Sequence, residues 1–103
     1  MVDRFLWYQL SLGEQLGQIA REIKGAKESE EEDDTEERSV YISSALELLE
    51  LTLRDQRFRE HVSELEYLYS ALVSWQKNTP SWDPQKMINF CMSFLLDEEL
   101  PTT

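Results

Sequence analysis

Apolar residues recur at helical spacing near the start of the chain. Steps of four, three and four residues separate Leu12, Leu16, Ile19 and Ile23. Phe5 lies one heptad before Leu12, so the same face extends back toward the first residues. This period is typical of an amphipathic helix. With Asp3 as N-cap and Gly25 as C-cap, the pattern predicts one helix over residues 3–24.

Residues 35–79 contain no Gly or Pro, yet their apolar positions form two stripes. The first stripe is Ile42, Leu46, Leu49 and Leu53, and the second is Phe58, Val62, Leu65, Tyr69 and Leu72. The five-residue step between them turns the second stripe by roughly 140° at 100° per residue. We therefore predict a break at 54–57, with Asp55 as a cap, between helices over 35–54 and 56–78.

The stretch "NTPSWDPQKM" predicts the last helix boundary. Pro80 ends the preceding helix, and Asp83 with Pro84 caps and starts the next, which we expect over 84–98. Four helices joined by short connections predict an all-α fold. We expect a small four-helix bundle that forms a single domain, 1–103, with one long acidic loop between the first two helices.

The acidic loop is predicted from composition. The chain has a net charge of −11, and carboxylates crowd the segment "KESEEEDDTEERS". Crowded like charges favour an extended, solvated chain, so residues 25–34 are expected to form a loop, mobile over 25–33 and ordered from Asp34 onward. Asp34 and Glu37 form a capping box that starts the next helix. Electrostatic steering of a partner is assigned to Glu28, Glu30, Glu31, Glu32, Asp33 and Asp34.

Composition also limits the classes of function. The acidic balance disfavours direct binding to DNA or RNA, whose phosphates are contacted by Lys and Arg. A single cysteine excludes an internal disulfide and favours a reducing compartment. The longest apolar stretch, "MINFCMSFLL", is too short for a membrane span, and the first residues do not form a signal peptide. The chain is expected to be cytoplasmic.

Candidate catalytic groups do not combine into a recognisable site. Glu47 and Glu50 have the spacing of metal-binding carboxylates, but the partner ligands are missing. His61 has no nucleophile beside it in the sequence, and Cys91 lies in an apolar run typical of a buried thiol. We therefore predict no catalytic residue, no metal ligand and no cofactor.

The chain has more large apolar side chains than one small core would hide. The alternative is that the core buries all of them. Aromatic residues and Met are enriched at interfaces, and small residues allow close helix contact. Partner binding is assigned to Trp7, Tyr8, Gly13, Gly17, Ala20, Met87, Phe90, Met92 and Phe94. Self-association as a C2 homodimer is expected, through the last helix or the Gly13/Gly17/Ala20 face.

The leading hypothesis is a non-catalytic helical interaction module: a small regulator, inhibitor or assembly factor that binds a protein, with a basic partner favoured by the acidic charge. The alternative is an acidic nucleic-acid mimic, of the kind that phages use against host defence, which would inhibit a DNA- or RNA-binding protein. A mimic needs carboxylates spaced along a surface, whereas about half of them here are gathered in one segment. A metal-dependent helical enzyme is a distant third.

Overall fold

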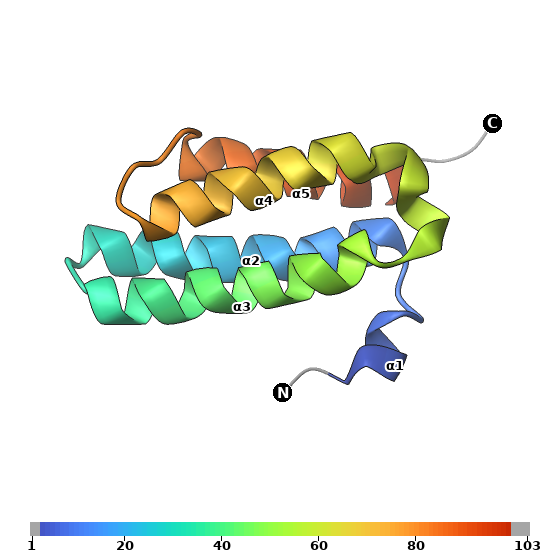
Figure 1. Ribbon diagram of the computed structural model, residues 1–103, viewed down its shortest axis with the longest axis horizontal. Helices are drawn as coiled ribbons and strands as arrows, with labels where there is room; N and C mark the ends of the chain where they lie inside the picture. Colours follow the sequence, from blue (N-terminus) through green and yellow to red (C-terminus); the bar gives the residue numbers. More distant parts are fainter. Residues whose placement is uncertain (1–2, 100–103) are drawn as a thin grey trace.

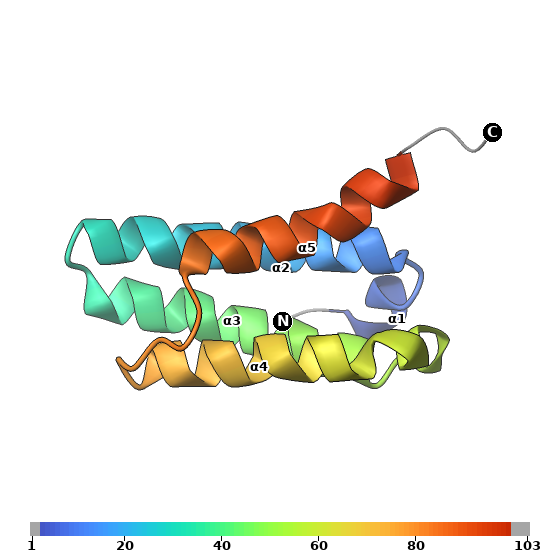
Figure 2. The same cartoon turned by 90° about the horizontal axis from the view of Figure 1, so that it is seen from above.

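The computed structural model describes residues 3–99, and every regular element in that range is helical. The elements are α1 (Arg4–Trp7), α2 (Leu12–Glu31), α3 (Thr35–Leu53), the 3₁₀ helix η1 (Gln56–His61), α4 (Val62–Gln76) and α5 (Pro84–Glu99). The four long helices form a bundle in which α2 lies beside α3 and α5, α3 lies beside α4, and α1 lies at one end (Figures 1 and 2). This arrangement fits a four-helix bundle.

The first predicted helix, 3–24, is wrong in its continuity. Asp3 does cap a helix, because its side chain accepts from the Phe5 amide at 2.9 Å, but that helix ends at Trp7. A new helix starts after Ser11, whose hydroxyl accepts from the Glu14 amide at 3.1 Å while the Glu14 carboxylate accepts from the Ser11 amide at 2.9 Å. This reciprocal capping box fixes a helix start inside the apolar period.

The predicted acidic loop over 25–34 is also wrong. Helix α2 continues through Gly25 to Glu31, and the turn to α3 is only three residues long. Local contacts support the last turns, because Lys27 pairs with Glu31 at 2.8 Å and the Ser29 hydroxyl donates to the Gly25 carbonyl at 2.9 Å. The helix ends where Asp33 takes a φ of 59° and the Asp34 amide donates to the Ser29 carbonyl at 2.8 Å. That pairing is a Schellman-type C-cap.

Gly25 allows α2 and α3 to approach closely. A Cβ added at this position would lie 2.5 Å from a ring carbon of Tyr41 on α3. At Gly17 the nearest atom would be Leu95 Cδ2, at 3.3 Å. The first contact meets a stiff aromatic ring and the second meets the end of a flexible side chain.

We expect overpacking in Gly25→Ala to destabilise the protein by about 1–3 kcal/mol. The roughly 1 kcal/mol that Ala gains over Gly in a helix offsets part of this loss. The matched variant Gly17→Ala should be neutral or stabilising, because the same propensity gain meets little steric resistance. Urea unfolding of both variants measures the difference. Equal stability of the two would contradict the close α2–α3 contact.

The predicted break at 54–57 is confirmed. Helix α3 starts at Thr35, after Asp34 accepts from the Glu37 amide at 3.0 Å, and ends at Leu53. Asp55 caps η1 by accepting from the Arg57 amide at 3.1 Å. The predicted helix 56–78 is a 3₁₀ segment followed by α4, which ends at Gln76.

The last helix follows its prediction closely. Asp83 accepts from the Gln85 amide at 2.8 Å, and α5 begins at Pro84. Pro at the first helical position loses no intrahelical hydrogen bond, which makes this start favourable. The helix runs to Glu99, one residue beyond the predicted end.

One apolar core fills the space between the four long helices. Its fully buried side chains include Leu16, Ile19, Ile23, Ile42, Leu49, Leu65, Leu68, Leu72, Trp75 and Met87. Within residues 3–99, no helix is both long and apolar enough to cross a membrane.

A buried polar network fastens α1 to this core. The Thr52 hydroxyl lies 2.8 Å from Gln15 Oε1, and the Gln15 amide nitrogen donates to the Trp7 carbonyl at 3.0 Å. The Trp7 indole donates in turn to the Thr52 oxygen at 3.3 Å. Because these polar groups satisfy one another, Trp7 is buried in the core at 5% exposure.

Candidate functional site

Helices α4 and α5 meet through aromatic side chains, whereas α2–α3, α2–α5 and α3–α4 bring their backbones close together. The rings form a row: Tyr67 to Trp82 at 5.3 Å between centroids, Trp82 to Phe90 at 5.6 Å, Phe90 to Phe94 at 5.2 Å, and Phe94 to His61 at 5.2 Å. Most of these pairs meet edge to face, which is a favourable geometry for aromatic rings. We call this row the α4–α5 seam.

The seam opens at the protein surface as an apolar cavity of about 320 Å³. Its lining residues are Ser63, Glu64, Tyr67, Trp82 and Phe90. Tyr67 is 60% exposed, while Trp82 and Phe90 are half-buried and present part of their rings. A partner could therefore gain contact with aromatic surface that is already ordered.

The rings beside the cavity come from α4, from the α4–α5 connection and from α5. Trp82 directly precedes the Asp83 cap of α5, so the start of that helix fixes its backbone. Phe90 and Phe94 lie one turn apart on α5, where Phe90 meets Trp82 and Phe94 meets His61 of η1. Trp82 in turn meets Tyr67 on α4. Figure 2 shows α4 and α5 running in opposite directions.

The rim of the cavity on α4 is acidic. Helix α4 contains Glu64 and Glu66 and no Lys or Arg. Glu64 lines the cavity, and its carboxylate lies 3.5 Å from Nδ1 of His61. A cavity lined by aromatic rings and one carboxylate is suited to an apolar side chain that has a positively charged side chain next to it.

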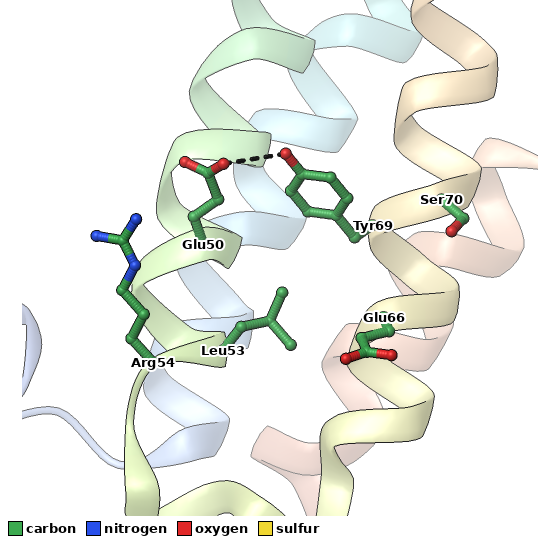
Figure 3. A pocket seen from close by; sticks show the side chains of 6 residues that line it. All are labelled: Glu50, Leu53, Arg54, Glu66, Tyr69 and Ser70. Carbon is green, nitrogen blue, oxygen red and sulfur yellow. Dashed lines mark hydrogen bonds between the residues drawn. The ribbon is translucent and has the colours of Figure 1, made fainter.

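A second hollow lies between α3 and α4, where most of the lining side chains carry a polar or charged group (Figure 3). It encloses about 470 Å³ and is lined by Glu50, Leu53, Arg54, Glu66, Tyr69 and Ser70. The Tyr69 hydroxyl donates to Glu50 at 3.0 Å, and this bond raises the pKa of Tyr69. The phenol is therefore kept protonated as a donor, which makes it a poor general base.

A third hollow lies beneath α1. It has a volume of about 360 Å³ and is lined by Asp3, Leu6, Trp7, Leu10, Gln18, Glu22, Ser44 and Leu48. Phe5 and Leu6 on α1 are 77% and 60% exposed. This end of the α2–α3 layer is thus another exposed apolar surface, separate from the seam.

The predicted partner-binding residues do not form one surface. Trp7, Gly13, Ala20 and Met87 are buried, and Tyr8, Gly17, Phe90, Met92 and Phe94 are half-buried. Of these nine, Phe90 alone lines the seam cavity. The large apolar side chains most exposed within residues 3–99 are instead Phe5, Leu6, Val40, Tyr67 and Leu96.

The small-residue face of α2 lies against α5 of the same chain. The Gly13 amide donates to the Glu98 carboxylate at 2.6 Å, and the Ser11 hydroxyl donates to it at 2.5 Å. A Cβ at Gly13 would lie 2.6 Å from that carboxylate. The glycines are therefore explained by packing within one chain, with a carboxylate placed favourably at the start of α2.

The acidic residues assigned to steering lie on and beside the end of α2. The Glu30 carboxylate accepts from the Trp75 indole at 2.8 Å and lies 3.7 Å from the buried Arg38 guanidinium. Glu31 pairs with Lys27, and Asp34 is half-buried as the cap of α3. The remaining three, Glu28, Glu32 and Asp33, are exposed. Their charges are therefore fixed in space by a helix.

Arg57 shows how the chain satisfies a basic group internally. Its guanidinium donates to the carbonyls of Tyr8 and Leu10 at 2.9 and 3.0 Å. It also donates to both carboxylate oxygens of Asp55, and this hydrogen bonding lowers the pKa of Asp55. The pair fastens the α1–α2 connection to the start of η1.

The residues considered for catalysis lie apart. Glu47 is exposed on α3, Glu50 binds Tyr69, and His61 lies edge-on to Phe94. Over residues 3–99, no three His, Cys, Asp or Glu side chains are grouped so as to hold a metal ion.

Cys91 is buried in the core, and desolvation raises the pKa of its thiol from 9.0 to about 12. The thiolate fraction at neutral pH is then about a thousandfold lower than for a free cysteine. We expect a thiol reagent such as DTNB to react with the folded protein extremely slowly and with the urea-unfolded protein at the rate of a free thiol. Rapid reaction without denaturant would contradict the burial of Cys91.

No protein-family model, curated protein or solved structure matches this chain. Function must therefore be argued from the chain's own residues.

Proposed function

We propose that the chain is a non-catalytic helical module that binds another protein, acting as a small regulator, inhibitor or assembly factor. One observation carries this proposal: the α4–α5 seam presents aromatic side chains around a surface cavity, with Tyr67 60% exposed. Tyr and Trp are enriched among residues that dominate binding energy at protein interfaces. The ring row also fixes these side chains before binding, which reduces the entropy lost on association.

The α3–α4 hollow and the hollow beneath α1 support this function less well. In the α3–α4 hollow, Tyr69 and Glu50 already bond to each other. Polar groups that are satisfied within the chain gain little by exchanging partners. The apolar hollow beneath α1 is edged by the charged residues Asp3 and Glu22.

The test is affinity capture from cells that express the protein natively, with wild-type chain, Tyr67→Glu and Val40→Glu as baits. Val40 is a matched control, because it is 68% exposed and lies on α3. We expect a partner that is captured by wild type and Val40→Glu and lost with Tyr67→Glu. Loss of the same partner with Val40→Glu, or its retention by Tyr67→Glu, would contradict the seam as the binding surface.

Self-association as a C2 homodimer remains a prediction. A second copy would carry the same net charge of −11, so two copies repel at low salt. Contact through the Gly13/Gly17/Ala20 face would also require displacement of α5, which occupies it. Analytical ultracentrifugation over a range of salt concentrations measures the oligomeric state directly.

The alternative is an acidic mimic of nucleic acid that inhibits a DNA- or RNA-binding protein. The ordered end of α2 favours it to a degree, since Glu28 and Glu32 are exposed on a helical frame. The charges nevertheless remain gathered at one end of the bundle, and Lys27 offsets Glu31 there. A mimic would lose its target when Glu28 and Glu32 are replaced by Gln, and would be insensitive to Tyr67→Glu.

A further inference from the structure

The shape of the seam suits one kind of partner element. Helix α4 has 15 residues and is therefore roughly 22 Å long at 1.5 Å per residue. Beside it, the rings run from Tyr67 on α4 through Trp82 in the connection to Phe90 and Phe94, one helical turn apart on α5. A third helix in such a groove can place its apolar residues, spaced by three or four, against successive rings.

The charge of this chain indicates which side chains the partner helix would carry. Glu64 forms part of the cavity wall, whereas Glu66 lines the α3–α4 hollow, and α4 contains no Lys or Arg. The chain as a whole carries −11. Such a field attracts a cationic partner and speeds its encounter, while it repels an acidic one.

We infer that the α4–α5 seam binds an amphipathic helix of a partner protein, with apolar residues seated in the cavity beside Tyr67, Trp82 and Phe90 and with Lys or Arg facing Glu64. This inference rests on the proposed function and adds the class of partner. A second copy of the chain is a poor occupant, because it would bring a further charge of −11 to an acidic surface.

The probe is a pair of synthetic helical peptides of about 18 residues, or five turns. Both have the same Leu and Trp face; one has Lys and the other Glu at the flanking positions. Binding to the full chain is measured by isothermal titration at low and high salt. We expect saturable binding of the Lys peptide alone, weakened by salt.

Three variants locate the binding site. Tyr67→Glu should weaken binding of the Lys peptide by about tenfold or more, as expected for loss of a central aromatic contact. Ser63→Trp, which fills the cavity from an exposed position of its wall, should weaken it similarly. Val40→Glu should leave it within about twofold, as for a charge added outside the interface. Circular dichroism checks that each variant is folded.

The outcomes separate this inference from the function on which it rests. No binding of the Lys peptide, equal binding of both peptides, or equal loss in Val40→Glu and Tyr67→Glu overturns the basic amphipathic helix. If a native partner is still captured in a Tyr67-dependent way, the interaction function stands with another class of partner. If neither peptide nor native partner depends on Tyr67, both proposals fail together.

Discussion

Replacing Trp75 with alanine is expected to lower the free energy of unfolding by about 3–5 kcal/mol, the range for a large aromatic side chain removed from a core. Trp75 is fully buried among the four long helices. Its indole also donates to Glu30 at 2.8 Å, so the variant leaves that carboxylate beside Arg38 without its main donor. Loss of packing and of this bond act in the same direction.

Trp82 provides the matched control for Trp75. It is half-buried at the seam, so Trp82→Ala should destabilise the protein much less, while it weakens partner binding more. Chemical unfolding followed by far-ultraviolet circular dichroism measures both stabilities. The assignment of Trp75 to the core would be wrong if Trp75→Ala lost less than about 1 kcal/mol, a typical value for surface changes.

Glycine in place of residues 28–31 is expected to destabilise the protein by about 4 kcal/mol, because each Gly costs roughly 1 kcal/mol relative to a good helix former. These four residues form the last turn of α2. The change also removes the Ser29 bond to Gly25 and the Glu30 bond to Trp75. Had this segment been a solvated loop, the same change would be nearly neutral.

Asp33→Gly is the control for the acidic segment. Asp33 has a φ of 59°, a left-handed conformation that Gly adopts without strain. This variant should be more stable than wild type, by up to about 1 kcal/mol. Thermal unfolding measures the stability of Asp33→Gly and of the variant with glycine at residues 28–31. If neither differed in stability from wild type, the helical end of α2 would be refuted.

Helix starts were the most predictable part of the fold. Asp3, Asp34, Asp55 and Asp83 were each expected to cap a helix, and each accepts a hydrogen bond from a nearby backbone amide. Capping depends on residues within one turn, so the sequence contains the whole signal. The same reasoning would have found Ser11 and Glu14, but the apolar period on both sides of them favoured one continuous helix.

The end of α2 could not be placed from charge alone. Counting carboxylates predicts repulsion, whereas the structure pairs Glu31 with Lys27 and Glu30 with Trp75, which is 45 residues away. The first pair is local and visible in the sequence at spacing i, i+4. The second depends on where the bundle places the end of α4 relative to α2, which no local pattern specifies.

The candidate site was only partly foreseeable. An excess of aromatic side chains for one small core was clear from the sequence, and Phe90, which was assigned to partner binding, lines the seam cavity. Met87 lies on the same helix but is fully buried, and Tyr67 was not selected although it is 60% exposed. Exposure here is set by the spacing between α4 and α5, a tertiary property.

Photo-cross-linking tests the central claim, that the α4–α5 seam is the protein-binding surface, most directly. Benzoylphenylalanine is placed at Tyr67 in one variant and at Val40 in another, and both are irradiated in cells that express the protein natively. The proposed function predicts a discrete cross-linked product from position 67 and none from position 40. A product from position 40 alone, the same products from both positions, or none from either would contradict it.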